Sequence, residues 1–134
     1  MSRKHILSAL IAFILIISLA IPTFAEIENG DGRLAGFDYI YTVDVDDVHA
    51  VGEFDTTDDT IRITGSLTAY CWCSVHTEMY TNHDYDSGMG KARTLVDNKV
   101  PTTDDTPYYH LCLINYAYFK AEIGSASRSW TVYS

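Results

Sequence analysis

The residue pattern predicts an all-β protein, a small antiparallel β-sandwich of about five to seven strands. The dominant hydrophobic period after residue 36 is two, which is typical of strands buried on one face. Ten tyrosines and frequent threonines suit such a pleated, half-buried surface. No stretch after residue 25 keeps a helical period, and turn-forming segments separate the alternating ones.

Alternation places five strands along the chain. They are expected at 37–46, 61–76, 92–96, 108–123 and 128–133. Gly65 is expected to mark a bulge or bend in the second of them. Turns are expected at 55–59, 86–90 and 124–127. The pentapeptide Thr56–Thr60 recurs letter for letter at 102–106, and we attribute the repeat to the ease with which short Thr/Asp turns arise.

Residues 1–25 have the three-part pattern of a cleaved secretory signal, with cleavage expected between Ala25 and Glu26. The apolar run from 6 to 21 is shorter than the roughly 20 residues that cross a bilayer, so we expect no stable membrane anchor. The expected product is secreted and extracellular. It would consist of a flexible polar lead-in at 26–36 and one β-sandwich domain at 37–134.

The expected mature chain is strongly acidic. It holds all 18 acidic residues but only 7 of the 9 basic ones, which gives a formal net charge of −11. Such a surface repels phosphate backbones, so nucleic acid is excluded as a partner class. The charge also argues against a cationic, membrane-lysing peptide. Cations, basic proteins and neutral ligands remain as partner classes.

Three cysteines are disulfide candidates: Cys71, Cys73 and Cys112. Cys71 and Cys73 share a strand face and point in parallel, which is a poor geometry for bridging each other. Cys112 is therefore the partner expected for one of them. The third thiol would stay buried, react, or link two chains in a disulfide-bonded dimer.

Free thiols and a zinc site are the alternatives to a bridge. A zinc site would combine the cysteines with imidazole ligands, but Cys-x-Cys-x-x-His is not a standard zinc spacing. The histidines concerned are His76, His83 and His110. We favour the bridge and expect neither a metal nor another cofactor.

The acidic segments give no calcium or catalytic signature. Residues 84–88 (DYDSG) resemble the opening of a calcium-binding loop, but Met89 and Leu95 stand where such a loop needs Gly and Glu. We therefore expect solvated turns there. The chain has no nucleophile elbow and no zinc-protease helix, so we do not expect an enzyme.

Alternating aromatic residues are the stronger functional indication. Tyr70 and Trp72 on one expected strand, and Tyr116 and Tyr118 on another, are candidate ligand-binding residues on a shared sheet face. Further aromatics that could extend this surface are Tyr39, Tyr41, Tyr108 and Tyr109. A core role is the alternative for any one of them, because both sheets of a small sandwich need large inward-facing residues.

Three C-terminal segments, 91–98 (KARTLVDN), 117–124 (AYFKAEIG) and 130–133 (WTVY), together resemble the lactococcin 972-type bacteriocins. These are small exported β-sandwich proteins of Gram-positive bacteria. The resemblance implies an antibacterial protein that acts at the bacterial cell envelope by engaging the precursor lipid II, and no functional residue carries over from it. The alternative from the residues is an extracellular binding or structural module that uses the aromatic sheet face on an envelope component or another protein.

Overall fold

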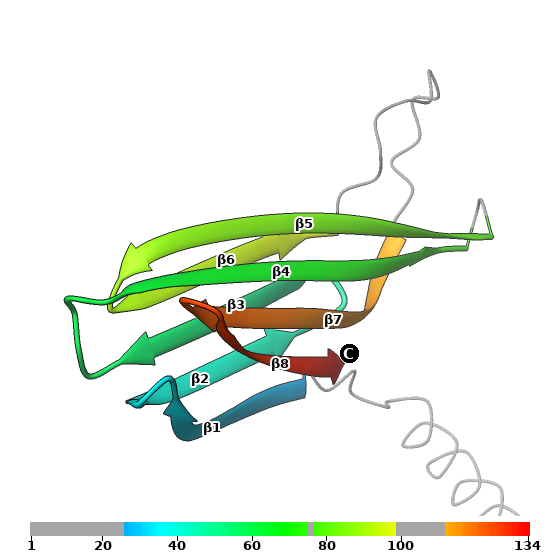
Figure 1. The fold of residues 1–134 in the computed structure, drawn as a ribbon. Coiled ribbons are helices and arrows are strands. Elements are labelled where there is room, and N and C mark those ends of the chain that lie inside the picture. The colour runs from blue at the N-terminus through cyan, green and yellow to red at the C-terminus, as the bar shows by residue number, and fades with distance from the viewer. Residues whose placement is uncertain (1–25, 75–76, 99–111) are drawn as a thin grey trace, which may run out of the picture.

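The computed structural model describes residues 26–74, 77–98 and 112–134, which form eight antiparallel strands in two four-stranded sheets (Figure 1). The first sheet has the order β1-β2-β3-β6 and the second the order β5-β4-β7-β8. The strands are β1 (Glu26–Leu34), β2 (Phe37–Val45), β3 (His49–Thr56), β4 (Arg62–Cys73), β5 (Glu78–Met89), β6 (Lys91–Asp97), β7 (Cys112–Ile123) and β8 (Ala126–Tyr133). The all-β prediction is confirmed, with one strand more than the expected range.

The expected flexible lead-in is a strand. β1 pairs with β2 along its whole length, from Glu26 opposite Val45 to Leu34 opposite Phe37. The two-residue turn between them has φ of 52° at Ala35 and 86° at Gly36. Positive φ at both positions is the mark of the hairpin turn whose twist matches that of the flanking strands. The sequence did not predict this strand, because β1 is polar and glycine-rich and lacks hydrophobic alternation.

β3 and β5 were not among the expected strands, and the segment expected to turn at 86–90 is mostly the end of β5. Only Gly90, with a φ of 75°, redirects the chain, and it carries it from β5 in the second sheet to β6 in the first. The expected strand at 108–123 begins, within the described residues, at Cys112. The signal segment, the second pentapeptide copy and Tyr108, Tyr109, His76 and His110 lie outside the described residues.

Gly65 is not the site of the bulge. Its pairing continues without interruption to Asp86 of β5 and to Ala121 of β7. The register shift lies between Tyr70 and Cys71 of β4, opposite the extra residue Asn115 of β7. Gly65 serves packing instead, because a Cβ there would lie 3.1 Å from that of Ala92 on the other sheet.

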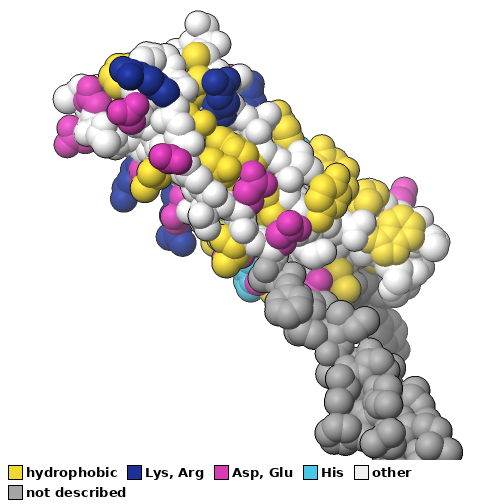
Figure 2. All heavy atoms as spheres, turned by 90° about the horizontal axis from the view of Figure 1, so that it is seen from below, with side chains coloured by type: hydrophobic (Ala, Val, Ile, Leu, Met, Phe, Trp, Pro, Cys, Tyr) yellow, Lys and Arg dark blue, Asp and Glu magenta, His cyan; other side chains and the backbone are white. Residues whose placement is uncertain are grey.

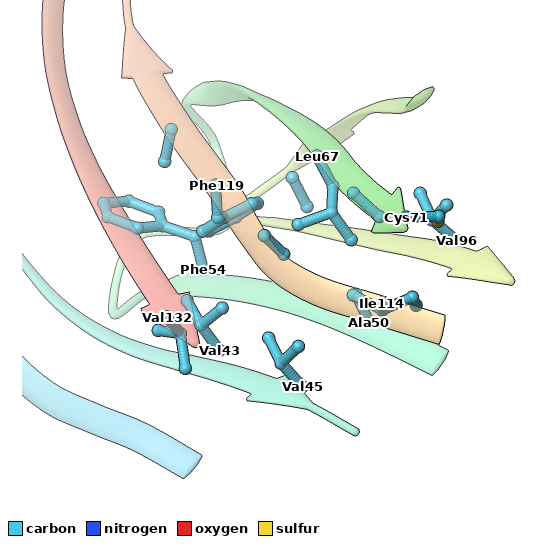
Figure 3. Packing of buried hydrophobic residues seen from close by; sticks show 14 of the residues in the cluster. Val43, Val45, Ala50, Phe54, Leu67, Cys71, Val96, Ile114, Phe119 and Val132 are labelled. Atoms are coloured by element: carbon cyan, nitrogen blue, oxygen red, sulfur yellow. The ribbon is translucent and has the colours of Figure 1, made fainter. Parts of the chain in front are cut away.

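The core lies between the two sheets, and Figure 3 shows Phe54 of β3 and Phe119 of β7 extending into the space between them. Phe119 occupies the space over Gly52, where a Cβ would lie only 2.3 Å from its Cδ2 atom. Both phenylalanines are fully buried. The sheets therefore approach closely at a position where one carries a large ring and the other carries no side chain.

The two long sides of the sandwich differ. β5 and β6 face each other along one side, and β1 and β8 along the other (Figure 1). Seen from below, where β1, β2 and β8 lie, hydrophobic side chains alternate with acidic ones (Figure 2). Among residues 26–74, 77–98 and 112–134, no helix is long and apolar enough to span a membrane.

Candidate binding face

The four predicted aromatic residues lie together on the outer face of the second sheet. Tyr70 and Trp72 come from β4, and Tyr116 and Tyr118 from β7, with Tyr70 directly opposite Tyr116. Tyr133 of β8 extends the row, since it is directly opposite Tyr116. Met79 and Leu113 flank Trp72 on either side. We call these seven residues the aromatic face: Tyr70, Trp72, Met79, Leu113, Tyr116, Tyr118 and Tyr133.

The register shift in β7 makes this surface continuous. With strict alternation, Tyr116 would point to the same side as Cys112 and Ile114, which are buried in the core. The extra residue Asn115 restores the outward direction at Tyr116, and Ala117 then faces the core. Without the bulge, the rings of both Tyr116 and Tyr118 would leave the surface and overfill the interior.

Three rings of the aromatic face, those of Tyr70, Tyr116 and Tyr133, contact one another, and Trp72, Tyr118 and Tyr133 are exposed. Tyr70 and Tyr116 stack with centroids 4.4 Å apart and planes 14° from parallel. Tyr133 lies 5.5 Å from Tyr116 at 40°. The exposed fractions of Trp72 and Tyr133 are 41% and 60%, so these large apolar side chains are not core residues. These contacts hold the rings of Tyr70, Tyr116 and Tyr133 in place before any ligand arrives.

The aromatic face is uncharged, although the chain carries a net charge of −9. Its outward-pointing neighbours on β4, β5 and β8 are Thr68, Thr81, His83 and Thr131, none of them acidic, and His83 Nδ1 lies 2.9 Å from the Thr68 hydroxyl. The nearest charged positions along β7 are Lys120 and Glu122, which pair with each other at 2.7 Å. The hydrogen bond to Glu122 raises the pKa of Lys120.

Tyr39 and Tyr41 do not extend this face. Tyr39 is buried and stacks on Phe54, with ring centroids 4.6 Å apart. Tyr41 stacks on Trp130 at 4.1 Å and donates its hydroxyl to Glu28. Burial, followed by the bond to this carboxylate, raises the pKa of Tyr41. These two rings help close the β1–β8 side of the sandwich.

All three cysteines point into the core, and the structure does not contain the expected disulfide. Cys73 of β4 lies directly opposite Cys112 of β7, while Cys71 lies opposite Ile114. Burial is the main cause that raises the pKa of Cys112 to about 12, assisted by its hydrogen bond to Cys73. Burial also raises the pKa of Cys71.

The zinc alternative does not assemble from the described residues. His83 lies on the outer face of the second sheet, whereas the cysteine side chains point inward from the same sheet. No group of three or more His, Cys, Asp or Glu residues able to hold a metal occurs in the described ranges.

Two acidic side chains of the segment 84–88 accept hydrogen bonds from backbone N–H groups of β6. Asp84 Oδ2 accepts the N–H of Leu95 and Asp86 Oδ2 that of Arg93, each at 2.8 Å. Asn82 donates to the Asp97 carbonyl at 2.9 Å. These three side chains, which we call the edge clasp, bond alternate residues of β6 in antiparallel order. They provide hydrogen-bond partners for backbone groups on the outer edge of β6, where no further strand pairs. The prediction of a solvated turn at 84–88 was wrong, because Asp84 and Asp86 lie within β5.

A shallow depression of about 560 Å³ lies over the opposite sheet, lined by residues of β1 and β2 and by the end of β3. Ile40 is exposed there, and Arg33 lies 3.8 Å from Asp38 in an exposed ion pair. This region combines scattered charges with one apolar side chain and lacks the clustered rings of the aromatic face.

Comparisons with family models, curated proteins and solved structures gave no match. The fold and the arrangement of side chains therefore provide the basis for a functional conclusion.

Proposed function

We propose that this protein is an exported β-sandwich module that binds an uncharged glycan of the bacterial cell envelope through the aromatic face. The observation that carries the proposal is a set of neighbouring aromatic rings, three exposed and two half-buried, in an uncharged area of an acidic protein. Exposed apolar patches of this kind mark interaction sites, because a soluble protein gains nothing by leaving several large rings in water.

Sugar rings fit the chemistry of this surface. Their C–H faces stack on aromatic rings, and their hydroxyls bond the neighbouring Thr68, Thr81 and His83. An anionic polymer would be repelled by the net charge of the protein, whereas a neutral one would not. Rings already held in place by stacking lose little conformational freedom on binding.

The decisive measurement is co-sedimentation of the purified mature protein with insoluble chitin and cellulose, which are uncharged, and with peptidoglycan stripped of its anionic polymers, which supplies the envelope glycan strand. The fluorescence of Trp72 provides a second signal in solution, since the other tryptophan of the chain, Trp130, packs against the core. We expect at least one polysaccharide to bind and to change this fluorescence.

Trp72→Ala and Tyr116→Ala are each expected to weaken binding at least tenfold while the protein stays folded. Tyr85→Ala is the matched control, because Tyr85 is 65% exposed on the same sheet but lies opposite Ser66, far along β4 from Trp72. An equal loss in all three variants, or no binding to any glycan, would refute the proposal. Binding to a protein partner instead would identify a different ligand class.

An antagonist of other bacteria is the second candidate function, supported by the resemblance to lactococcin 972-type bacteriocins. The segments that carry it form β6, the second half of β7 and the second half of β8. Adding the mature protein to growing Gram-positive cells tests this function. A septation or growth defect is expected, and normal growth across a broad panel of strains would exclude it.

A further inference from the structure

We propose that Cys73 and Cys112 form an intrachain disulfide in the exported protein, while Cys71 remains a buried thiol. The proposal goes beyond glycan binding and uses only the export expected from the signal segment. Export places the chain where disulfides form and persist. Which two sulfurs can join is then a question of strand geometry.

The hydrogen bonds around β7 define the type of strand pair that Cys112 makes. The Ile114 N–H donates to the carbonyl of Asp47, and the Cys112 carbonyl accepts from Asn98 Nδ2, both at 2.9 Å. Residues two apart on a strand direct their backbone groups to the same side. The N–H and C=O groups of Cys112 therefore point away from β4, and its pairing with Cys73 is non-hydrogen-bonded.

This pair type has the spacing that a disulfide needs. Residues opposite each other in a non-hydrogen-bonded antiparallel pair have Cα atoms about 4.5 Å apart, within the range of about 4.4–6.8 Å found in disulfides. Both side chains are fully buried on the inner face, so they also point to the same side of the sheet. A bridge between Cys73 and Cys112 requires no change of register.

Cys71 is excluded by the same geometry. Its opposite residue is Ile114, which makes Cys112 a diagonal neighbour. Diagonal pairs lie about 7–8 Å apart, beyond the usual disulfide range. Cys71 is also fully buried, so it offers no surface thiol for a second chain. The structure thus favours an internally bridged monomer over a disulfide-linked dimer.

The bridge forms by exchange with a small-molecule or protein disulfide. One protein thiolate attacks that disulfide and releases a thiol, and the second protein thiolate then displaces the remaining half, so two protein thiols become one disulfide and the reagent is reduced to two thiols. The raised pKa of Cys112 leaves very little thiolate at neutral pH once the core has closed. The exchange therefore occurs during folding, when β4 and β7 have brought Cys73 and Cys112 opposite each other but the core has not yet closed over the two sulfurs.

The bridge would also support the aromatic face. Trp72 and Leu113 are opposite each other and directly adjacent in sequence to Cys73 and Cys112, but on the outer side of the sheet. A covalent link beneath them fixes the separation of β4 and β7 where the first ligand-binding rings begin.

The test is mass spectrometry of mature protein refolded with reduced and oxidised glutathione. The expected product is a monomer about 2 Da lighter than the fully reduced chain, because one bridge removes two hydrogens. Alkylation after denaturation should label only Cys71. Fragmentation should place the bridge between Cys73 and Cys112. These readouts do not depend on ligand binding, so a failed bridge and a failed glycan interaction are distinguishable.

Alanine variants supply the controls. Cys71→Ala should retain the mass loss of about 2 Da, and Cys73→Ala and Cys112→Ala should each lose it. Because masses are read after denaturation, the comparison holds even for a variant that folds poorly. A wild-type product with three alkylated cysteines, a Cys71–Cys112 bridge, or a disulfide-linked dimer would each overturn the assignment.

Discussion

Replacing Asp84 and Asp86 together by alanine removes the two acceptors through which β5 holds the outer edge of β6. Each carboxylate oxygen lies 2.8 Å from the backbone nitrogen that it accepts from, on Leu95 and Arg93. Hydrogen bonds to charged groups contribute about 1.5–3 kcal/mol. Water competes at these exposed positions, so we take roughly 1 kcal/mol for each bond and about 2 kcal/mol for the pair.

A loss of about 2 kcal/mol in the free energy of unfolding corresponds to a fall in Tm of roughly 8–16 °C for a domain of this size. The N–H groups of Leu95 and Arg93 would also become an unpaired strand edge, which promotes association between molecules. We therefore expect faster amide exchange at these two residues and a greater tendency to aggregate.

The assay combines thermal unfolding with residue-resolved hydrogen exchange. Asp31→Ala is the control for the loss of an exposed carboxylate, because Asp31 is exposed on β1 and makes no side-chain hydrogen bond to the described residues. Replacing Asp84 and Asp86 by asparagine keeps an acceptor oxygen and should give an intermediate Tm. If the double alanine variant matched Asp31→Ala in Tm and left exchange at Leu95 and Arg93 unchanged, the edge clasp would have no stabilising role.

Two further predictions concern the core. Gly52→Ala should lower the free energy of unfolding by about 1–3 kcal/mol, because the new Cβ would meet the ring of Phe119. Adding Phe119→Leu should recover part of this loss, as measured by urea titration. A Gly52→Ala variant as stable as the wild type would contradict this packing. The reduced protein should lose stability as pH rises from about 9 to about 12, because the unfolded Cys112 thiol ionises first while the folded one holds its proton up to a pKa of about 12. Urea titrations of the reduced protein on either side of pH 9 should reveal this slope, and its persistence in Cys112→Ala would assign it to another group.

The sequence predicted four of the seven residues of the aromatic face, and only the strand register added Met79, Leu113 and Tyr133. Alternation within β4 correctly places Tyr70 and Trp72 on one face, and alternation within the second half of β7 does the same for Tyr116 and Tyr118. That the two pairs share a face depends on the extra residue at Asn115, which reverses the parity of β7. Nothing in the sequence around Asn115 signals a bulge, because strand pairing alone defines the register.

The failure to predict β5 has a different origin. Its inward positions include Asn82, Asp84 and Asp86, so the usual rule of apolar residues facing inward does not apply there. These polar side chains face β6 because they bond its unpaired backbone edge. A pattern based on hydrophobicity cannot recognise a strand whose inner face is chosen for hydrogen bonding.

The sequence by itself determined the all-β class, most of the strands that carry the core, and the residue types available for binding. These properties follow from local alternation and turn chemistry, which neighbouring residues decide. Only the tertiary structure decided which aromatic rings are exposed, which cysteine lies opposite Cys112, and why the acids of β5 point inward. Each of these depends on the register between strands distant in sequence, and that register is set by packing and backbone pairing across the whole sandwich.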